Sequence, residues 1–282
     1  MAEILKGAPV AAAMTEALKA RADALKEKGV EPCLAILRVG ERPEDLTYER
    51  GAMKRCEKIG IRVEQVVLDD TCTQQELLRA IARINDDTVI HGCLMLRPLP
   101  KHLNEQEASE MLTPAKDVDS MTSASLLSVF TGRGAGFAPC TAQSVVELLD
   151  YYEVPLSGAR VAVIGRSLVI GKPVSMMLQA RNATVTMCHT KTRDMAAVCR
   201  EADILVVAAG KAGVVDGSFT NPGQVVIDVG INAKPDGGIC GDVNFEETEP
   251  LVRAITPVPG GVGSVTTAVL CKHVIEAAEK IG

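Results

Sequence analysis

The sequence predicts an α/β protein made of two α/β domains, each built on a parallel sheet. Short aliphatic runs alternate with amphipathic segments along most of the chain, which is the pattern of buried parallel strands and the helices that cover them. The chain has 282 residues, enough for two domains. Aromatic residues make up only 2% of it, so we expect a core of aliphatic side chains, as in strands that are buried on both faces.

The first alternating series occupies the N-terminal half. We expect helices at 8–28, 44–59 and 73–86, and strands at 33–40, at 61–69 and from 91 into a Pro-rich loop. Gly29 and Gly60 follow the first two helices, where glycine is the usual terminating residue. Residues 113–140 are rich in Ser, Thr and Gly and are expected to form a loop, with a helix after them at 141–154.

The second series is expected to form a Rossmann-like, doubly wound parallel sheet. Its strands are expected near 160–164, 183–189, 203–210 and 224–230. This places a first domain at 1–139 and a second at 140–263. The final helix, within 264–282, is expected to pack back on the first domain.

Composition limits the partners and the location. The formal net charge is −6 and the pI is about 5.4, which argues against nucleic acid or an anionic membrane as a partner. No stretch approaches the ~20 apolar residues of a membrane helix, and the N-terminal segment lacks the apolar core of a signal peptide, so we expect a cytoplasmic protein. The nine cysteines are scattered without a C-x-x-C pair, so we expect reduced thiols and no metal site.

One local pattern predicts a nucleotide site. An aliphatic strand runs into Gly165, and a short loop through Arg166 and Ser167 reaches Gly171, followed by a helix with Pro173 in its first turn. A strand, a glycine loop and a helix in this order place free N–H groups and the positive end of the helix dipole where a pyrophosphate binds. Because Ser167 stands at the second glycine position of the usual motif, a plain strand-to-helix turn stays an alternative for this pattern taken alone.

The next strand indicates which nicotinamide cofactor fits. NAD-specific sites carry an acidic residue about 20 positions after the glycine loop, but the sequence there reads His189, Thr190, Lys191 and Thr192. Hydroxyl and cationic groups accept a 2′-phosphate, which a carboxylate would repel, and Arg166 adds a guanidinium. We therefore expect NADP, with NAD as the alternative.

Segments spread in order from residue 48 to 270 resemble the methylenetetrahydrofolate dehydrogenase/cyclohydrolase (FolD) family. They are Tyr48 with Lys54 and Cys56 downstream, RPLPKHLN, PAKDVD, PCTAQSVVELL, VIGRSLVIGKPV, ATVTMCHTKT, DVGIN, GDVNFEE and TPVPGGVGSVTTAVL. The resemblance implies an N-terminal domain that binds tetrahydrofolate, a second domain that binds NADP, a cleft between them, and a homodimer. It implies hydride transfer from 5,10-methylenetetrahydrofolate to NADP, and most members then hydrolyse the methenyl product to 10-formyltetrahydrofolate.

The resemblance also assigns the site residues. Asp119 matches the residue that pairs with the pterin ring, whose adjacent N–H groups suit a carboxylate, and Tyr48 matches the aromatic residue that packs along the aminobenzoyl ring. The segment 257–263, rich in Pro and Gly, matches the loop that closes over the substrate. The candidates are Tyr48 and Asp119 as catalytic residues; Tyr48, Leu96, Arg97, Asp119, Pro259, Gly260 and Gly261 at the substrate; and Gly165, Arg166, Ser167, Gly171, Thr190 and Ile231 at the cofactor.

Two positions depart from the family. The lysine that the family uses for hydrolysis lies four residues after the tyrosine, where this chain has Ala52, and the glutamine that contacts it is Leu96. Lys54 is rotated by about 200° around the helix and points away from that face. Hydride transfer needs the alignment of two rings, whereas hydrolysis needs a proton moved, which an ionisable group accelerates by roughly 10²–10⁴-fold. We therefore expect a dehydrogenase with weak or absent cyclohydrolase activity.

Two alternatives stay open at this point. The first is a bifunctional enzyme in which Arg97 or another group replaces the missing lysine, although a guanidinium is a poor general base because it stays protonated. The second is a catalytically silent protein that binds folate or a nucleotide. The intact glycine loop argues against the silent protein, and a hydrolysis assay separates the bifunctional enzyme from the dehydrogenase.

Overall fold

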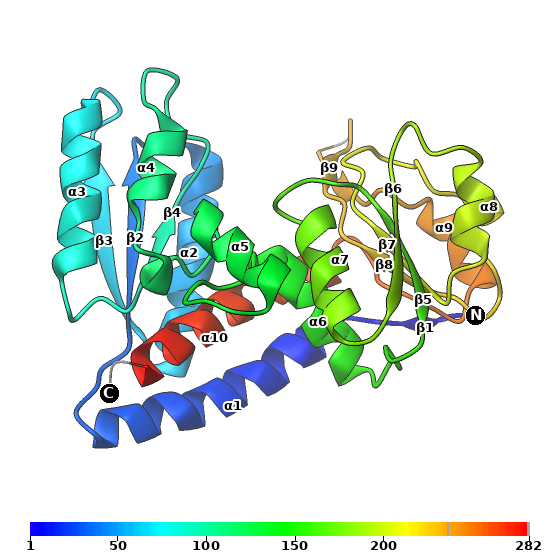
Figure 1. The fold of residues 1–282 in the computed structure, drawn as a ribbon, viewed down its shortest axis with the longest axis horizontal. Helices are drawn as coiled ribbons and strands as arrows, with labels where there is room; N and C mark the ends of the chain where they lie inside the picture. The colour runs from blue at the N-terminus through cyan, green and yellow to red at the C-terminus, as the bar shows by residue number, and fades with distance from the viewer. Residues whose placement is uncertain (236, 281–282) are drawn as a thin grey trace. The chain divides into compact units, whose positions relative to one another are not determined.

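A computed structural model describes residues 1–235 and 237–280, which form two compact units (Figure 1). Residues 1–11 and 141–266 contain a six-stranded sheet and are called the large-sheet unit. Residues 12–140, with the described residues from 267 onward, contain a three-stranded sheet and are called the small-sheet unit.

The small-sheet unit is built on three parallel strands in the order β3-β2-β4. These are β2 (Cys33–Val39), β3 (Arg62–Leu68) and β4 (Gly92–Met95). The helices are α2 (Pro43–Ile59), α3 (Gln74–Asp86), α4 (Glu105–Met111) and α5 (Ser123–Thr131), with a 3-10 turn at Pro114–Lys116, most of α1 (Gly7–Glu27) and nearly all of α10 (Thr266–Glu279).

Local sequence signals explain where these helices begin and end. Pro43 opens α2, where its missing N–H costs nothing, and Gly60 closes it in the left-handed conformation with φ 88°. Thr73 and Glu76 form a capping box at the start of α3. The α2 and α3 helices therefore match the sequence expectation closely.

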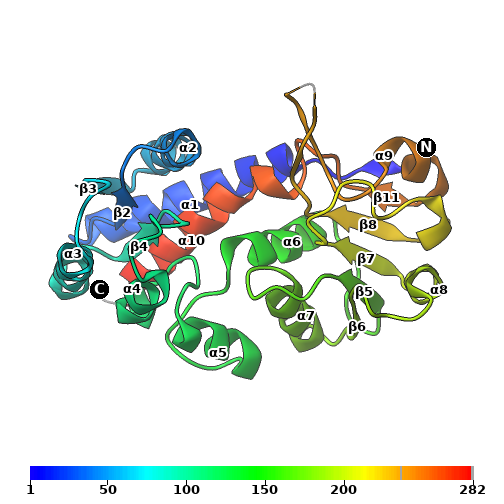
Figure 2. The ribbon, with the colours of Figure 1, turned by 90° about the horizontal axis from the view of Figure 1, so that it is seen from above.

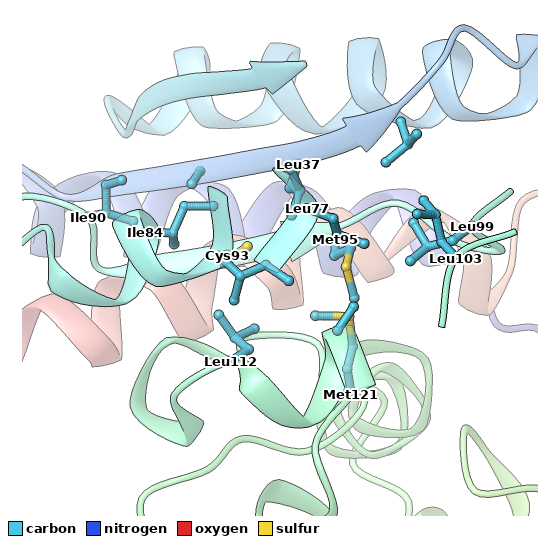
Figure 3. Packing of buried hydrophobic residues seen from close by; sticks show 14 of the residues in the cluster. Leu37, Leu77, Ile84, Ile90, Cys93, Met95, Leu99, Leu103, Leu112 and Met121 are labelled. Atoms are coloured by element: carbon cyan, nitrogen blue, oxygen red, sulfur yellow. The ribbon is translucent and has the colours of Figure 1, made fainter. Parts of the chain in front are cut away.

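The strands of the small sheet present side chains to two faces. Alternate residues of β2 and β4 pack against buried leucine and isoleucine side chains of α3 (Figure 3). These core residues include Cys33, Ala35, Leu37, Cys93, Met95, Leu77, Ile81 and Ile84. The intervening residues of β2, including Arg38, point to the opposite face, where Glu49 of α2 meets Arg38.

The large-sheet unit has six parallel strands in the order β1-β11-β8-β7-β5-β6. They are β1 (Glu3–Ile4), β5 (Arg160–Ile164), β6 (Thr184–Cys188), β7 (Ile204–Val207), β8 (Val225–Asp228) and β11 (Ala254–Ile255). A small antiparallel hairpin joins β9 (Asn232–Ala233) to β10 (Ile239–Cys240). The helices are α6 (Cys140–Tyr151), α7 (Gly171–Ala180), α8 (Met195–Arg200) and α9 (Phe245–Thr248), with 3-10 turns at Gly217–Phe219, Glu249–Leu251 and Val262–Ser264.

This arrangement confirms the predicted α/β class and its doubly wound parallel sheet. Figure 2 shows α7 and α8 on opposite faces of the large sheet. The strand order reverses at β5, because the chain goes from β5 to β6 on one side and then to β7 on the other. In open sheets of this kind, ligands bind beyond the carboxyl ends of the strands at such a reversal.

Three differences from the sequence expectation concern the predicted first domain. The segment 113–140, expected as a loop, contains the 3-10 turn at Pro114–Lys116 and the nine-residue helix α5, which Thr122 caps by accepting from the N–H of Ser125. Helix α4 was not expected. Residues 1–11, assigned to the first domain from the sequence, lie with the large sheet, because β1 pairs with β11. Both strands of this pair have two residues, too few for a periodic pattern to reveal them.

All nine cysteines are among the described residues, none of them forms a disulfide, and every one except Cys240 is buried. Within 1–235 and 237–280, no helix combines the length and the apolar character that crossing a membrane requires.

Candidate functional site

The glycine loop lies at the carboxyl end of β5, where the strand order reverses. Gly165 has φ 126°, and a Cβ atom there would lie 2.2 Å from the carbonyl oxygen of Ala208. A Cβ on Gly171 would lie 2.2 Å from the carbonyl oxygen of Gly165. Both positions therefore require glycine, because the backbone passes too closely for any side chain. The helix begins at Gly171, two residues before Pro173, which stays within the first turn.

Arg166 and Ser167 occupy the exposed part of this loop. The hydroxyl of Ser167 accepts from the N–H of Ile170 at 3.2 Å, and its carbonyl accepts from the N–H of Lys172 at 3.0 Å. These two hydrogen bonds from within the loop fix the conformation in which the chain passes from Ser167 into α7. The side chain of Arg166 is left to solvent beside the start of α7.

The loop after β6 brings a second candidate to the same edge. The N–H of Gly165 donates to the carbonyl of Cys188, the last residue of β6, at 3.0 Å. Thr190 follows two residues later and is exposed. The ring of His189 accepts through Nδ1 from the N–H of Lys191 at 3.1 Å, which leaves Nε2 as the protonated nitrogen. The loop that carries Arg166 and the loop that carries His189 and Thr190 therefore begin at the carboxyl ends of two neighbouring strands, β5 and β6.

A pocket of about 280 Å³ lies at the ends of β8 and β11. It is lined by residues 228–231, by Ile239 and by 257–264, so it joins Ile231 with Pro259, Gly260 and Gly261. Ile231 is 66% exposed, which leaves its backbone and side chain open to a ligand. The structure thus brings together the candidates that the sequence placed in two separate motifs.

Two residues that the sequence analysis did not select hold this pocket. The N–H of Gly7, at the start of α1, donates to the carbonyl of Gly260 at 2.8 Å, and a Cβ on Gly7 would lie 2.1 Å from the carbonyl oxygen of Gly261. Asp228 lines the pocket and accepts from the N–H groups of Gly230 and Val243, each at 2.9 Å. Burial raises the pKa of Asp228 to about 6, and these hydrogen bonds oppose the rise. Asp228 is the first residue of the DVGIN segment. That segment resembles the FolD family, but the resemblance does not single out its carboxylate.

In the small-sheet unit, Asp119 lies in a segment that other side chains hold in place. The carboxylate of Asp117 is fully buried and accepts from the N–H groups of Met121 and Thr122, each at 2.8 Å. The ammonium of Lys116 donates to the carbonyl oxygens of Ile84, Asn85 and Asp87 at 2.6–2.8 Å, which anchors the segment to the end of α3. Lys116 and Asp117 belong to the KDVD run, whose first two residues were not selected from the sequence.

Asp119 itself accepts from the N–H of Cys140 at 3.3 Å. Burial raises the pKa of Asp119, while hydrogen bonds from Cys140 and the positive charge of Arg97 act in the opposite direction. The guanidinium of Arg97 also lies 3.7 Å from the carboxylate of Glu105. Arg97 therefore interacts with the carboxylates of Asp119 and Glu105. A guanidinium is a poor proton acceptor because it is already protonated.

Tyr48, Ala52 and Leu96 occupy the other face of the small sheet. Tyr48 is 37% exposed on α2, whereas Ala52 is fully buried and Leu96 nearly so. Leu96 extends β4 by donating its N–H to the carbonyl of Leu37 at 2.9 Å, and it alternates with Met95, which faces α3. Lys54 is exposed. The positions of the family lysine and glutamine are thus both buried and apolar in this chain.

A buried ion pair stands beside these apolar positions. The carboxylate of Glu49 accepts from Nε of Arg38 at 3.0 Å and from the amide of Gln65 at 2.7 Å. Glu49 and Arg38 are both buried, so removal of either side chain would leave the other without its ion-pair partner in the interior. Glu49 follows Tyr48 directly on α2, and the pair fixes this helix against β2 and β3.

Comparison with known proteins identifies the two halves of the chain. Residues 5–119 match the family model described as tetrahydrofolate dehydrogenase/cyclohydrolase, catalytic domain, and residues 139–281 match the one described as its NAD(P)-binding domain. A protein of Carboxydothermus hydrogenoformans named bifunctional protein FolD is 53% identical over 99% of this chain and 98% of its own length. A protein of the same name from Clostridioides difficile is 49% identical over 98% of this chain and 96% of its own length.

Solved structures agree with this assignment. The bifunctional enzyme FolD of Campylobacter jejuni superposes with a TM-score of 0.95 and 38% identity over 99% of both chains. The FolD of Trypanosoma brucei, solved with NADP and an inhibitor, superposes with a TM-score of 0.91 and 35% identity over 99% of this chain and 98% of its own. The chain therefore belongs to the tetrahydrofolate dehydrogenase/cyclohydrolase (FolD) family.

Proposed function

We propose that this protein oxidises 5,10-methylenetetrahydrofolate to 5,10-methenyltetrahydrofolate by transferring a hydride to NADP. The observation that carries the proposal is the edge of the large sheet formed by the glycine loop and the loop after β6. It offers backbone N–H groups, Arg166, His189 and Thr190 to a dinucleotide, and the described residues 189–193 that follow β6 include no carboxylate to repel a 2′-phosphate. The matched NAD(P)-binding domain and the NADP-bound relative support the same choice.

The chain's own residues bind and orient the reactants. NADP, when bound, supplies the nicotinamide ring that accepts the hydride. Gly165 and Gly171 let the backbone approach the pyrophosphate, and Ile231 with the segment 257–263 forms the wall of a pocket at the same edge. In the small-sheet unit, Asp119 would accept from the N–H groups of the pterin and Tyr48 would pack along the aminobenzoyl ring. Hydride transfer then needs alignment and little proton chemistry.

We further propose that the same chain hydrolyses the methenyl product to 10-formyltetrahydrofolate. Relatives at 53% and 49% identity carry the name bifunctional, and this favours two activities over the sequence expectation of a weak or absent hydrolase. That expectation rested on Ala52 and Leu96, and the comparisons lend it no support. Hydrolysis in this chain must then proceed without an ionisable group at position 52.

A two-part assay tests both reactions. The purified protein is mixed with methylenetetrahydrofolate and NADP or NAD, and the reduced nicotinamide is followed by absorbance. Separately, the loss of methenyltetrahydrofolate absorbance is followed without nicotinamide. Reduction of NADP in preference to NAD supports the first proposal, and catalysed loss of the methenyl compound supports the second. If the methenyl compound is lost only at the uncatalysed rate, the second proposal is wrong and the chain is a dehydrogenase without hydrolase activity, as the sequence predicts.

Two further parts of the proposal are a homodimer and a cytoplasmic location. The first follows from the resemblance to the family, and the second from the composition of the chain. Sedimentation at several protein concentrations tests the dimer. A single monomeric species at the highest concentration would contradict it.

A further inference from the structure

A fully buried carboxylate joins two loops of the large-sheet unit. Oδ2 of Asp242 accepts from the N–H groups of Ala209 at 2.6 Å and Gly210 at 2.8 Å. Oδ1 accepts from the N–H of Lys211 and from the side-chain amide of Asn232, each at 2.9 Å. Three consecutive N–H groups and one amide thus surround a charge that burial alone would make very unfavourable.

The first of these loops follows β7 and touches the glycine loop. Ala208 donates its N–H to the carbonyl of Ile164 at 2.8 Å, at the end of β5. Its carbonyl oxygen lies where a Cβ on Gly165 would come within 2.2 Å. The backbone of Ala208 is therefore one wall of the glycine loop, and Asp242 fixes the three residues that follow it.

The second loop follows β8 and carries Ile231. Asn232, which donates to Asp242, is the next residue and begins β9. A Cβ on Gly230 would lie 2.2 Å from the carboxyl carbon of Asp242, so the carboxylate packs directly against this backbone. The N–H of Asp242 donates in turn to Asp228, which lines the pocket, at 3.0 Å.

We propose that Asp242 is a positioning residue for the nicotinamide cofactor. It holds the loop after β7 against the glycine loop and sets its distance from Ile231, without contacting the cofactor itself. Four donors that converge on one carboxylate fix both loops before the ligand arrives, which removes an ordering cost from binding. The inference rests on the proposed use of NADP by this unit. It adds a residue that supports the cofactor-binding loops without contacting the cofactor.

The variant Asp242→Asn tests the proposal with little change of shape. The amide replaces one acceptor oxygen with an NH₂ group, so at least two of the four donors lose their acceptor whichever way the amide turns. We expect the KM for NADP to rise about tenfold or more, the value that corresponds to one lost charge-assisted hydrogen-bond contact. The KM for methylenetetrahydrofolate should stay within about threefold of its original value, and saturating NADPH should restore most of the lost melting temperature.

Asp216→Asn is the matched control. Asp216 also accepts from a backbone N–H, that of Ser218 at 2.8 Å, but it caps the short 3-10 turn at Gly217–Phe219. The Asp216→Asn variant should leave the KM for NADP unchanged. If Asp242→Asn lowers the melting temperature yet leaves the KM for NADP unchanged, the residue is only structural and the proposal is wrong.

A second variant decides the matter if Asp242→Asn does not fold. Asn232→Ala removes the side-chain hydrogen bonds that the second loop donates to Asp242 and to the carbonyl of Gly241, while the three N–H groups stay on Asp242. It should raise the KM for NADP by about threefold, in the same direction, and an unchanged KM would overturn the proposal. Calorimetric titration of the wild-type protein with NADPH separates this inference from the proposed reaction, because cofactor binding is measured there without folate.

Discussion

Nδ1 of His273 lies 2.8 Å from the carbonyl oxygen of Val118, a residue 155 positions earlier in the chain. A carbonyl oxygen only accepts, so Nδ1 of this buried ring carries the proton. The thiol of Cys140 donates to the same carbonyl at 3.3 Å, and the ring of His273 stacks on Phe137 with centroids 5.0 Å apart. Val118 immediately precedes Asp119, which we propose binds the pterin. The hydrogen bond from His273 therefore lets α10 hold the backbone from which the side chain of Asp119 projects.

We predict that His273→Leu raises the KM for methylenetetrahydrofolate by about five- to tenfold, because a lost hydrogen bond to a buried carbonyl is worth about 1–1.5 kcal/mol. His273→Asn keeps a donor near the position of Nδ1 and should recover most of the affinity. Steady-state kinetics with each substrate varied in turn checks this, and the KM for NADP serves as the internal control. An equal loss in both variants would show that His273 acts only through packing.

Replacing Gly165 should weaken cofactor binding. Gly165→Ala places a Cβ 2.2 Å from the carbonyl oxygen of Ala208 at φ 126°, so the glycine loop must move. We expect the affinity for NADPH, measured by calorimetry, to fall by about tenfold or more. Gly158→Ala is the control: Gly158 also has a positive φ, 80°, but its Cβ would meet nothing within 4 Å. Equal affinities in the two variants would refute a specific role for the close approach.

Restoring the family's polar pair should favour hydrolysis. In Ala52→Lys/Leu96→Gln, an ionisable group and its amide partner return to the α2 face of the small sheet. We expect the rate of methenyltetrahydrofolate hydrolysis relative to NADP reduction to rise by roughly 10²-fold. Ala52→Met/Leu96→Gln, of similar length and without the amine, should not show the rise. An unchanged ratio in the lysine variant would mean that hydrolysis in this chain already uses another group.

The stability of the protein should depend on pH through Asp228. Burial raises the pKa of this carboxyl from 3.8 to about 6, so the folded protein binds the proton more tightly than the unfolded chain does. The stabilisation is fully present below about pH 3.8 and is lost as the pH rises through about 6, with an upper limit of about 3 kcal/mol at 1.36 kcal/mol per pH unit. Asp228→Asn has no such titration.

Urea unfolding between pH 4 and pH 7 measures this effect. The free energy of unfolding of the wild-type protein minus that of Asp228→Asn should decrease by up to about 3 kcal/mol across the range. Other titrating groups are common to both proteins and cancel in the difference. A difference that stays constant would show that the hydrogen bonds from Gly230, Asp242 and Val243 fully offset the burial of the charge.

The sequence alone determined the fold class, the main strands and helices, and the glycine loop. These features leave local marks: aliphatic runs of strand length, glycines after α1 and α2, and a strand that runs into Gly165. The resemblance of ordered segments such as PAKDVD and TPVPGGVG also identified the family. Helix α5 was missed because its Ser- and Thr-rich start has the composition of a loop, and only the cap at Thr122 distinguishes it.

Only the tertiary structure decided which residues support the site. The hydrogen bond from His273 to Val118, the four donors around Asp242 and the contact of Gly7 with Gly260 each join segments far apart in the chain. Such contacts leave no periodic pattern, because a buried carboxylate or imidazole looks like any polar residue until its donors and acceptors are placed around it. The sequence predicts the residues that would contact the ligands. The tertiary structure determines which other residues hold those contact residues in position.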